Sequence, residues 1–118
     1  MSLPETLIKQ SSLTQRQLET LQSYLRVVLG ETSYREAAAG GPAKKVTIGS
    51  YYRTLQQAKG NIRESIVTLL VAIWLGLVRQ EDVRRLLDVT NRDIADLPGE
   101  EKERLVAVLG ALLDRIIT

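Results

Sequence analysis

The sequence contains no cysteine, no histidine and no phenylalanine among its 118 residues. The lack of cysteine excludes disulfides, thiolate nucleophiles and cysteine-ligated metal sites. The lack of histidine removes the commonest general base and the imidazole metal ligand. Most familiar enzyme designs are therefore excluded. We expect a protein that is not an enzyme and that binds neither a cofactor nor a metal ion.

Long hydrophobic runs are also scarce. The longest apolar stretch, residues 65–78 (SIVTLLVAIWLGLV), has 14 residues, whereas a membrane-spanning helix needs about 20. Residues 1–10 have no basic start followed by an apolar run and do not read as a secretory signal. These features predict a cytoplasmic protein without a membrane partner.

What is present is the composition of an ordinary globular domain, with 44% hydrophobic and 25% charged residues. The charge is unevenly distributed along the chain. Residues 1–63 hold nine Lys and Arg against four Asp and Glu, whereas residues 64–118 hold seven against ten. A basic first half favours a surface for a polyanion, and random scatter over solvated faces is the alternative.

Apolar residues recur with a helical period, and the pattern predicts an all-α fold of five or six helices. The first clear helix follows the hydroxyl caps of residues 12–14 and ends near Gly30. A short second helix covers residues 34–39, capped by Thr32 or Ser33 and ended by the glycines that follow. The apolar stripe expected on the first helix consists of Leu18, Leu21, Leu25 and Val28.

The third helix is expected to begin after a Thr47 cap and to carry one polar, basic side. Gly60 with Asn61 either breaks this helix or lies within it, and we favour a helix that continues through residue 78. Residues 46–48 form a short strand in a minor alternative. The apolar stripe of the third helix consists of Ile48, Tyr51, Leu55, Ala58 and Ile62.

Residues 65–78 are apolar nearly all round, so we expect other helices or a partner chain to enclose them. Trp74 is expected in the core, because large aromatic side chains contribute most when buried. A short helix over residues 80–89 and a last helix that opens near Pro98 complete the chain.

The order of a helix, a short helix, a glycine-containing turn and a third helix with a polar face is typical of a helix-turn-helix. In such a unit the third helix enters the major groove of DNA and reads base edges. Its tip would offer Gly49 for close approach. The residues expected to bind DNA are Lys44, Lys45, Thr47, Ser50, Tyr52, Arg53, Gln56, Gln57, Lys59 and Arg63.

Residues 13–21 (LTQRQLETL) resemble the opening of the helix-turn-helix in sigma-factor region-four and LuxR-type regulators, where a similar Leu-Thr-x-Arg-x-x-x-x-Leu precedes the first helix. Residues 33–38 (SYREAA) are similar to the second helix of those proteins. Val46 and Thr47 with the Ser-Tyr pair at 50 and 51 resemble the start of their recognition helix. The resemblance covers residues 13–62, and the turn differs by the insertion of GGPAKK.

This resemblance implies a DNA-binding fold in which the third helix reads the duplex. It further implies that Thr47, Ser50, Tyr52 and Arg53 face DNA, whereas Val46, Tyr51 and Leu55 belong to the core.

The second half of the chain suggests self-association, because its apolar surface is larger than the first three helices can cover. A homodimer would cover it, and packing of these helices on one another within one chain is the alternative. We therefore divide the chain into an arm (residues 1–11), a helix-turn-helix region (12–63) and a helical dimerisation region (64–118). The expected function is sequence-specific or architectural double-stranded DNA binding by a transcriptional regulator or a nucleoid-associated factor. A helical adaptor that binds another protein is the alternative, and an enzyme that uses carboxylates is the least favoured one.

Overall fold

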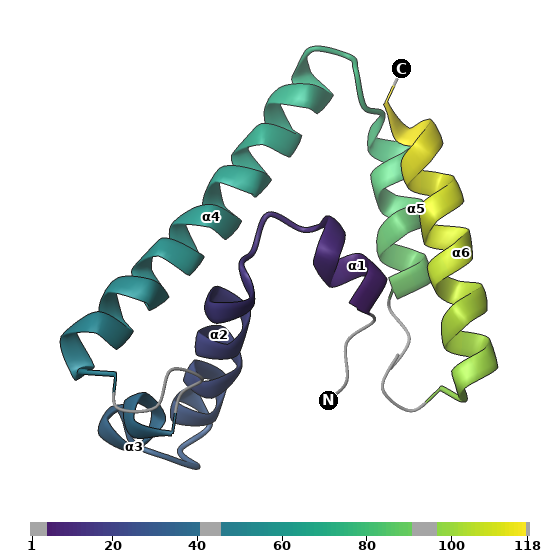
Figure 1. The fold of residues 1–118 in the computed structure, drawn as a ribbon. Helices are drawn as coiled ribbons and strands as arrows, with labels where there is room; N and C mark the ends of the chain where they lie inside the picture. Colours follow the sequence, from purple (N-terminus) through teal and green to yellow (C-terminus); the bar gives the residue numbers. More distant parts are fainter. Residues whose placement is uncertain (1–4, 41–45, 91–96, 118) are drawn as a thin grey trace. The chain divides into compact units, whose positions relative to one another are not determined.

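The computed structural model describes residues 5–40, 46–90 and 97–117. Within these residues the protein is all-helical and contains no strand, so the all-α prediction is confirmed and the strand at residues 46–48 is not formed. Figure 1 shows the helices in chain order. They are α1 (Glu5–Gln10), α2 (Gln15–Val28), α3 (Tyr34–Ala39), α4 (Ile48–Trp74), α5 (Gln80–Thr90) and α6 (Gly99–Ile116).

The chain forms two compact units, which are described separately. The first-half unit is Ser12–Ser65, and the second-half unit combines Met1–Ser11 with Ile66–Thr118. Helix α4 contributes residues to both. Helix α1 was not predicted, because its six residues lie in the segment that we interpreted as an arm.

Local signals in the sequence account for the ends of α2 and α3. Thr14 caps α2 in a capping box, in which its hydroxyl accepts from the Gln17 backbone N–H and the Gln17 side chain accepts from the Thr14 N–H. The helix ends in a Schellman motif at Gly30, whose φ of 77° favours glycine. Ser33 caps α3 in the same way as Thr14, with its hydroxyl accepting from the Glu36 N–H at 3.2 Å.

Helix α4 is a continuous helix of 27 residues that passes through Gly60 without a break. Its first turn is capped by Thr47, whose hydroxyl accepts from the Ser50 N–H at 3.1 Å. It ends in a second Schellman motif at Gly76, where φ is 79° and the Leu77 N–H donates to the Ala72 carbonyl oxygen. The predicted continuation past Gly60 is therefore confirmed, whereas the helix ends at Trp74 and does not reach residue 78.

The core of the first-half unit lies where α2, α3 and the beginning of α4 meet. Its buried residues are Ala37 and Ala38 from α3 and Tyr51 and Leu55 from α4. Ala58 is fully buried one turn further along α4. The partly buried side chains that pack against this core are Leu21, Tyr24, Val27, Tyr34 and Val46.

The inward face of α2 differs from the predicted stripe. Leu21 packs against the core, but Leu25 and Val28 are exposed, and Tyr24 and Val27 take their places. The reason is tertiary: the Tyr51 hydroxyl bonds to the α2 backbone at Thr20, and this contact turns the adjoining face of α2 toward α4.

A second link within this unit joins the start of α2 to the middle of α4. The Asn61 amide nitrogen donates to the Ser12 carbonyl oxygen and to the Gln17 side-chain oxygen, the latter at 3.2 Å. The Ser12 hydroxyl donates to the Asn61 side-chain oxygen at 2.9 Å. Asn61, which lies within the continuous helix, thus fixes α4 to the capping box of α2.

In the second-half unit, α5 and α6 pack side by side, as Figure 1 shows. Val78 and Leu109 are buried there. The prediction that Trp74 lies in the core is wrong, since its side chain is 93% exposed. It occupies the last residue of α4, on a face that the described residues leave uncovered. No helix among residues 5–40, 46–90 and 97–117 has the length and apolar character needed to cross a membrane.

Replacing Asn61 by alanine should lower the free energy of unfolding by about 1–2 kcal/mol, because hydrogen bonds between α2 and α4 are lost. The matched control is Gly60→Ala, which adds a methyl group where no neighbouring atom lies within 4 Å. That variant should raise stability by up to about 1 kcal/mol. Urea unfolding followed by circular dichroism measures both. Equal stability of the two variants would contradict the proposed role of Asn61.

Candidate nucleic-acid interface

The first half of α4 has a buried face that fixes its position in the first-half unit. Tyr51 is 3% exposed, Leu55 1% and Ala58 0%. The Tyr51 hydroxyl donates to the Thr20 carbonyl oxygen at 3.3 Å and lies 2.6 Å from the Ser23 hydroxyl. Because this phenol is both buried and hydrogen-bonded, it holds α4 in one rotational setting against α2.

The opposite face of this part of α4 is exposed. Residues on one face of a helix recur every three or four positions, and the exposed residues follow that spacing. We call them the polar face of α4. Its members are Gly49, Tyr52, Arg53, Gln56, Gln57, Lys59 and Arg63, all of which are exposed.

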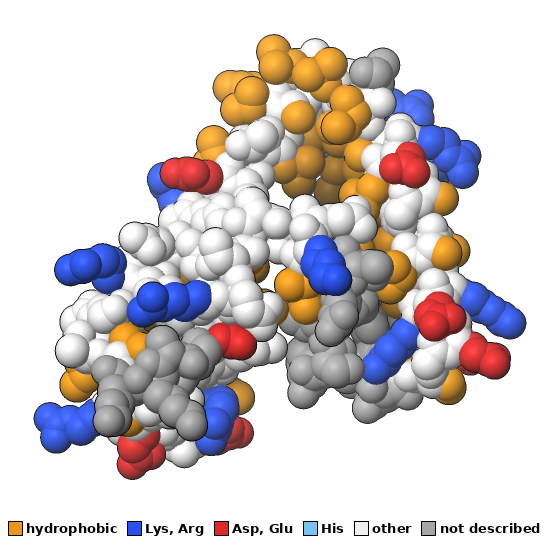
Figure 2. Space-filling view, viewed as in Figure 1, with side chains coloured by type: hydrophobic (Ala, Val, Ile, Leu, Met, Phe, Trp, Pro, Cys, Tyr) orange, Lys and Arg blue, Asp and Glu red, His pale blue; other side chains and the backbone are white. Residues whose placement is uncertain are grey.

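The polar face carries positive charge at Arg53, Lys59 and Arg63, and the exposed Glu64 follows directly after Arg63. No Asp or Glu occurs between Glu36 and Glu64. Among the described residues, Arg53 and Arg63 form no ion pair. Figure 2 shows blue Lys and Arg side chains over this part of the molecule. The arrangement is a helix face with cationic and amide donors, which are the groups that contact phosphates and base edges.

Two of the predicted residues lie at the start of α4 and are already engaged in the protein. The exposed Thr47 uses its hydroxyl as the helix cap. Ser50 is half-buried, and its hydroxyl accepts a hydrogen bond of 3.4 Å from the Arg16 guanidinium. Arg16, in the first turn of α2, thus places a further positive charge beside the start of α4. Sequence analysis quoted Arg16 within the Leu-Thr-Gln-Arg motif but assigned it no role.

Tyr52 and Lys59 do not project freely, because both contact a row of tyrosine rings. The Tyr52 and Tyr34 ring centroids are 5.0 Å apart, and those of Tyr34 and Tyr24 are 6.4 Å apart. The Lys59 ammonium lies 4.3 Å from the centroid of the Tyr24 ring and donates to the Tyr24 hydroxyl at 3.3 Å. A cation over an aromatic face is an attractive contact, so this row holds Lys59 in place.

The row joins α2, α3 and α4 along one edge of the polar face. Tyr24 and Tyr34 were missed in sequence analysis, since nothing in their local sequence shows that their rings meet. Two further predicted residues, Lys44 and Lys45, lie outside the described residues.

The second-half unit carries a polar cluster at the start of α5. Asp82 contacts Arg79 at 3.2 Å and Arg85 at 3.8 Å, so this carboxylate belongs to ion pairs at the start of α5. No group of three carboxylates within the described ranges is arranged to hold a metal ion.

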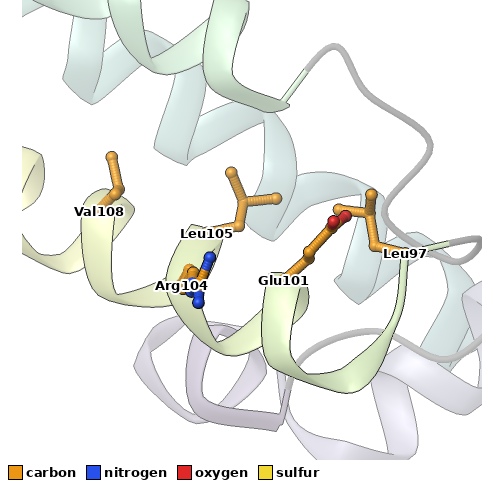
Figure 3. Close-up of a pocket in the computed structure, with 5 residues that line it drawn as sticks. All are labelled: Leu97, Glu101, Arg104, Leu105 and Val108. Atoms are coloured by element: carbon orange, nitrogen blue, oxygen red, sulfur yellow. The ribbon is translucent and has the colours of Figure 1, made fainter.

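An open pocket of about 340 Å³ lies along α6, and Figure 3 shows the residues that line it. Leu97, Leu105 and Val108 supply apolar side chains, and Glu101 and Arg104 supply one charge of each sign. The lining brings one carboxylate and one guanidinium together, and no second carboxyl group is among these five residues. The polar face of α4 is therefore the stronger candidate for a functional surface.

Comparison with known proteins gives no further guide to this surface. No protein-family model matches the sequence, and neither the curated proteins nor the solved structures gave a match.

Removing the Tyr51 hydroxyl should loosen the anchor of the polar face. We expect Tyr51→Phe to lower the free energy of unfolding by about 1–2 kcal/mol, because the Ser23 hydroxyl and the Thr20 carbonyl each lose a hydrogen bond and keep only the 2.9 Å bond between them. Tyr52→Phe is the matched control: its ring is 39% exposed, and we expect a change below about 0.5 kcal/mol. Thermal unfolding measures both variants. A larger loss for Tyr52→Phe would contradict the anchoring role of Tyr51.

Proposed function

We propose that this protein binds double-stranded DNA through the polar face of α4, as a cytoplasmic transcriptional regulator with a helix-turn-helix formed by α2, α3 and the first half of α4. The observation that carries the proposal is the division of this half-helix into a buried stripe of Tyr51, Leu55 and Ala58 and an exposed basic face, with no Asp or Glu over residues 37–63. A helix held in this way presents side chains to the major groove without losing its place in the fold.

The side chains of the polar face divide by chemistry into two roles. Arg53, Gln56 and Gln57 carry the guanidinium and amide groups that pair with purine edges. Lys59, Arg63 and Arg16 carry cations suited to phosphate contacts, which fix orientation without reading sequence. The resemblance to sigma-factor region-four and LuxR-type regulators supports the expectation that Ser50, Tyr52 and Arg53 face DNA.

Gly49 supplies independent support. Glycine is unfavourable in a helix by up to about 1 kcal/mol relative to alanine, and a Cβ added at Gly49 meets no atom within 4 Å. Packing within the protein therefore does not require glycine at this position. Close approach of a DNA backbone to the exposed tip of α4 would require it.

We further propose that the regulator acts as a homodimer. A two-fold pair presents two recognition helices to successive major grooves, about 34 Å apart along the duplex. One unit of each protomer would then bind DNA while the other joins the protomers.

A helical adaptor that binds another protein is the second candidate. It is favoured by the exposed apolar side chains at the end of α2, which are Leu25, Val28 and Leu29. Exposed apolar clusters of this kind occur in protein-binding surfaces. The two candidates differ in their response to salt, because phosphate contacts release counterions and apolar contacts do not.

Binding of duplex DNA fragments is measured by fluorescence anisotropy at a series of salt concentrations. The logarithm of the association constant should fall linearly with the logarithm of the salt concentration, with a slope of about −0.9 for each phosphate contact. Arg53→Ala should weaken binding by about 1–3 kcal/mol if this residue reads a base edge. Arg84→Ala is the matched control, since it removes the same charge from an exposed position on α5.

We expect the affinity of Arg84→Ala for DNA to stay within about twofold of the natural chain. Equal losses in the two variants would mean that only net charge matters and would remove Arg53 from the site. Absent or salt-insensitive binding by the natural chain would exclude the DNA proposal and favour the adaptor.

Gly49→Ala separates binding from stability. The added methyl group enters open space in the free protein, so we expect an unchanged or higher unfolding temperature. The same methyl group would obstruct a DNA backbone, and we expect about tenfold weaker binding. Differential scanning fluorimetry and anisotropy on one preparation measure the two effects. Unchanged affinity would place the duplex away from the tip of α4.

A further inference from the structure

The second half of α4 carries a continuous apolar face that nothing in the described chain covers. Ile66, Val67, Leu70, Val71 and Trp74 are spaced i, i+1, i+4, i+5 and i+8, so they lie on one side of the helix. Trp74 is 93% exposed and the other four are 46–58% exposed. We call this surface the Trp74 face. Figure 2 shows orange side chains gathered at this end of α4.

The Trp74 face is large enough to form an interface. Each exposed aliphatic side chain of this kind presents on the order of 100 Å², and a tryptophan about twice that. With Leu75 and Leu77, which are 70% and 45% exposed, the surface amounts to roughly 800 Å², about the area that each partner buries in a standard protein interface. Monomeric proteins rarely expose an apolar patch of this size.

The chemistry of the face favours a second copy of the chain as its occupant. Residues 65–78 contain no Asp, Glu, Lys or Arg. Two identical faces therefore meet without like-charge repulsion and without burying an unpaired charge. A two-fold interface needs a surface that is complementary to itself, and an uncharged helix face meets that condition.

We propose that two copies of the chain associate through their Trp74 faces, with Trp74 as the central anchor of each. Tryptophan is enriched among the residues that carry most of the binding energy at interfaces. This inference specifies the surface for the homodimer part of the proposed function. DNA binding is measured separately, so that failure of one proposal is distinguishable from failure of the other.

The test is sedimentation equilibrium of the full-length chain over a range of concentrations. We expect a species of twice the 13.2 kDa chain mass. Trp74 is the only tryptophan, so its fluorescence emission should shift to shorter wavelength over the same concentrations as the ring leaves water. Trp74→Asp and Leu70→Asp should each raise the dissociation constant about 30-fold or more. Helical circular dichroism should be retained, since both side chains are exposed in the single chain.

The matched control is Leu29→Asp, because Leu29 is a 71% exposed leucine outside the Trp74 face. This variant should dimerise like the natural chain. Dissociation by Leu29→Asp but not by the other two variants would overturn the proposal and place the interface at the end of α2. A natural chain that is monomeric at every concentration would also overturn it, leaving the face to another protein.

A second measurement covers the case in which an aspartate variant fails to fold. The chain has no cysteine, so Leu70→Cys introduces a single thiol at the middle of the face. A residue near the two-fold axis of a dimer lies close to the same residue of the second chain. Mild oxidation should therefore join the two Leu70→Cys thiols in a covalent dimer. Leu29→Cys is the control. Equal cross-linking of the two variants would contradict the proposed interface. A dimer that does not bind DNA would leave this inference intact and remove the proposed function.

Discussion

The burial of one stripe of α4 against α2 and α3 is the constraint on which the rest of the first-half unit depends. Tyr51, Leu55 and Ala58 are almost completely removed from solvent. The Tyr51 hydroxyl fixes the rotation of α4 through its contacts with Ser23 and the Thr20 carbonyl. Once this rotation is set, the direction of every other side chain in the first half of α4 follows from the helical period. The polar face is thus a geometric consequence of the anchor.

Helix α4 meets two different environments along its 27 residues. In its first half, the apolar side chains form a narrow stripe that α2 and α3 cover. In its second half, the apolar side chains run nearly all round the helix, and the described chain covers only part of them. A helix that is apolar on every side needs partners on every side. The first half of α4 is covered where it is apolar, so its polar side is free to contact DNA. The second half is only partly covered, so it offers an apolar surface to a second copy of the chain.

Much of the polar face was predictable from sequence because it depends on helical periodicity. The spacing indicated the buried positions Tyr51, Leu55 and Ala58, and Arg53 and Gln56 followed as exposed residues. The predicted stripe also included Ile48 and Ile62, which are exposed. The contributions of Arg16, Tyr24 and Tyr34 were not predictable in this way. Their contacts with Ser50, Lys59 and Tyr52 join residues of different helices, and no local pattern encodes which side chains of separate helices meet.

The sequence by itself determined where α2, α3 and α4 begin and where α2 ends, because caps and stop signals act over a few residues. Thr14, Ser33 and Thr47 cap helices with their own hydroxyl groups, and Gly30 and Gly76 adopt the positive φ that ends a helix. Only the tertiary structure decided which apolar residues are buried. Leu25 and Trp74 are apolar residues of the kinds that often lie in cores, yet both are exposed. Burial depends on whether another surface is present to cover a side chain.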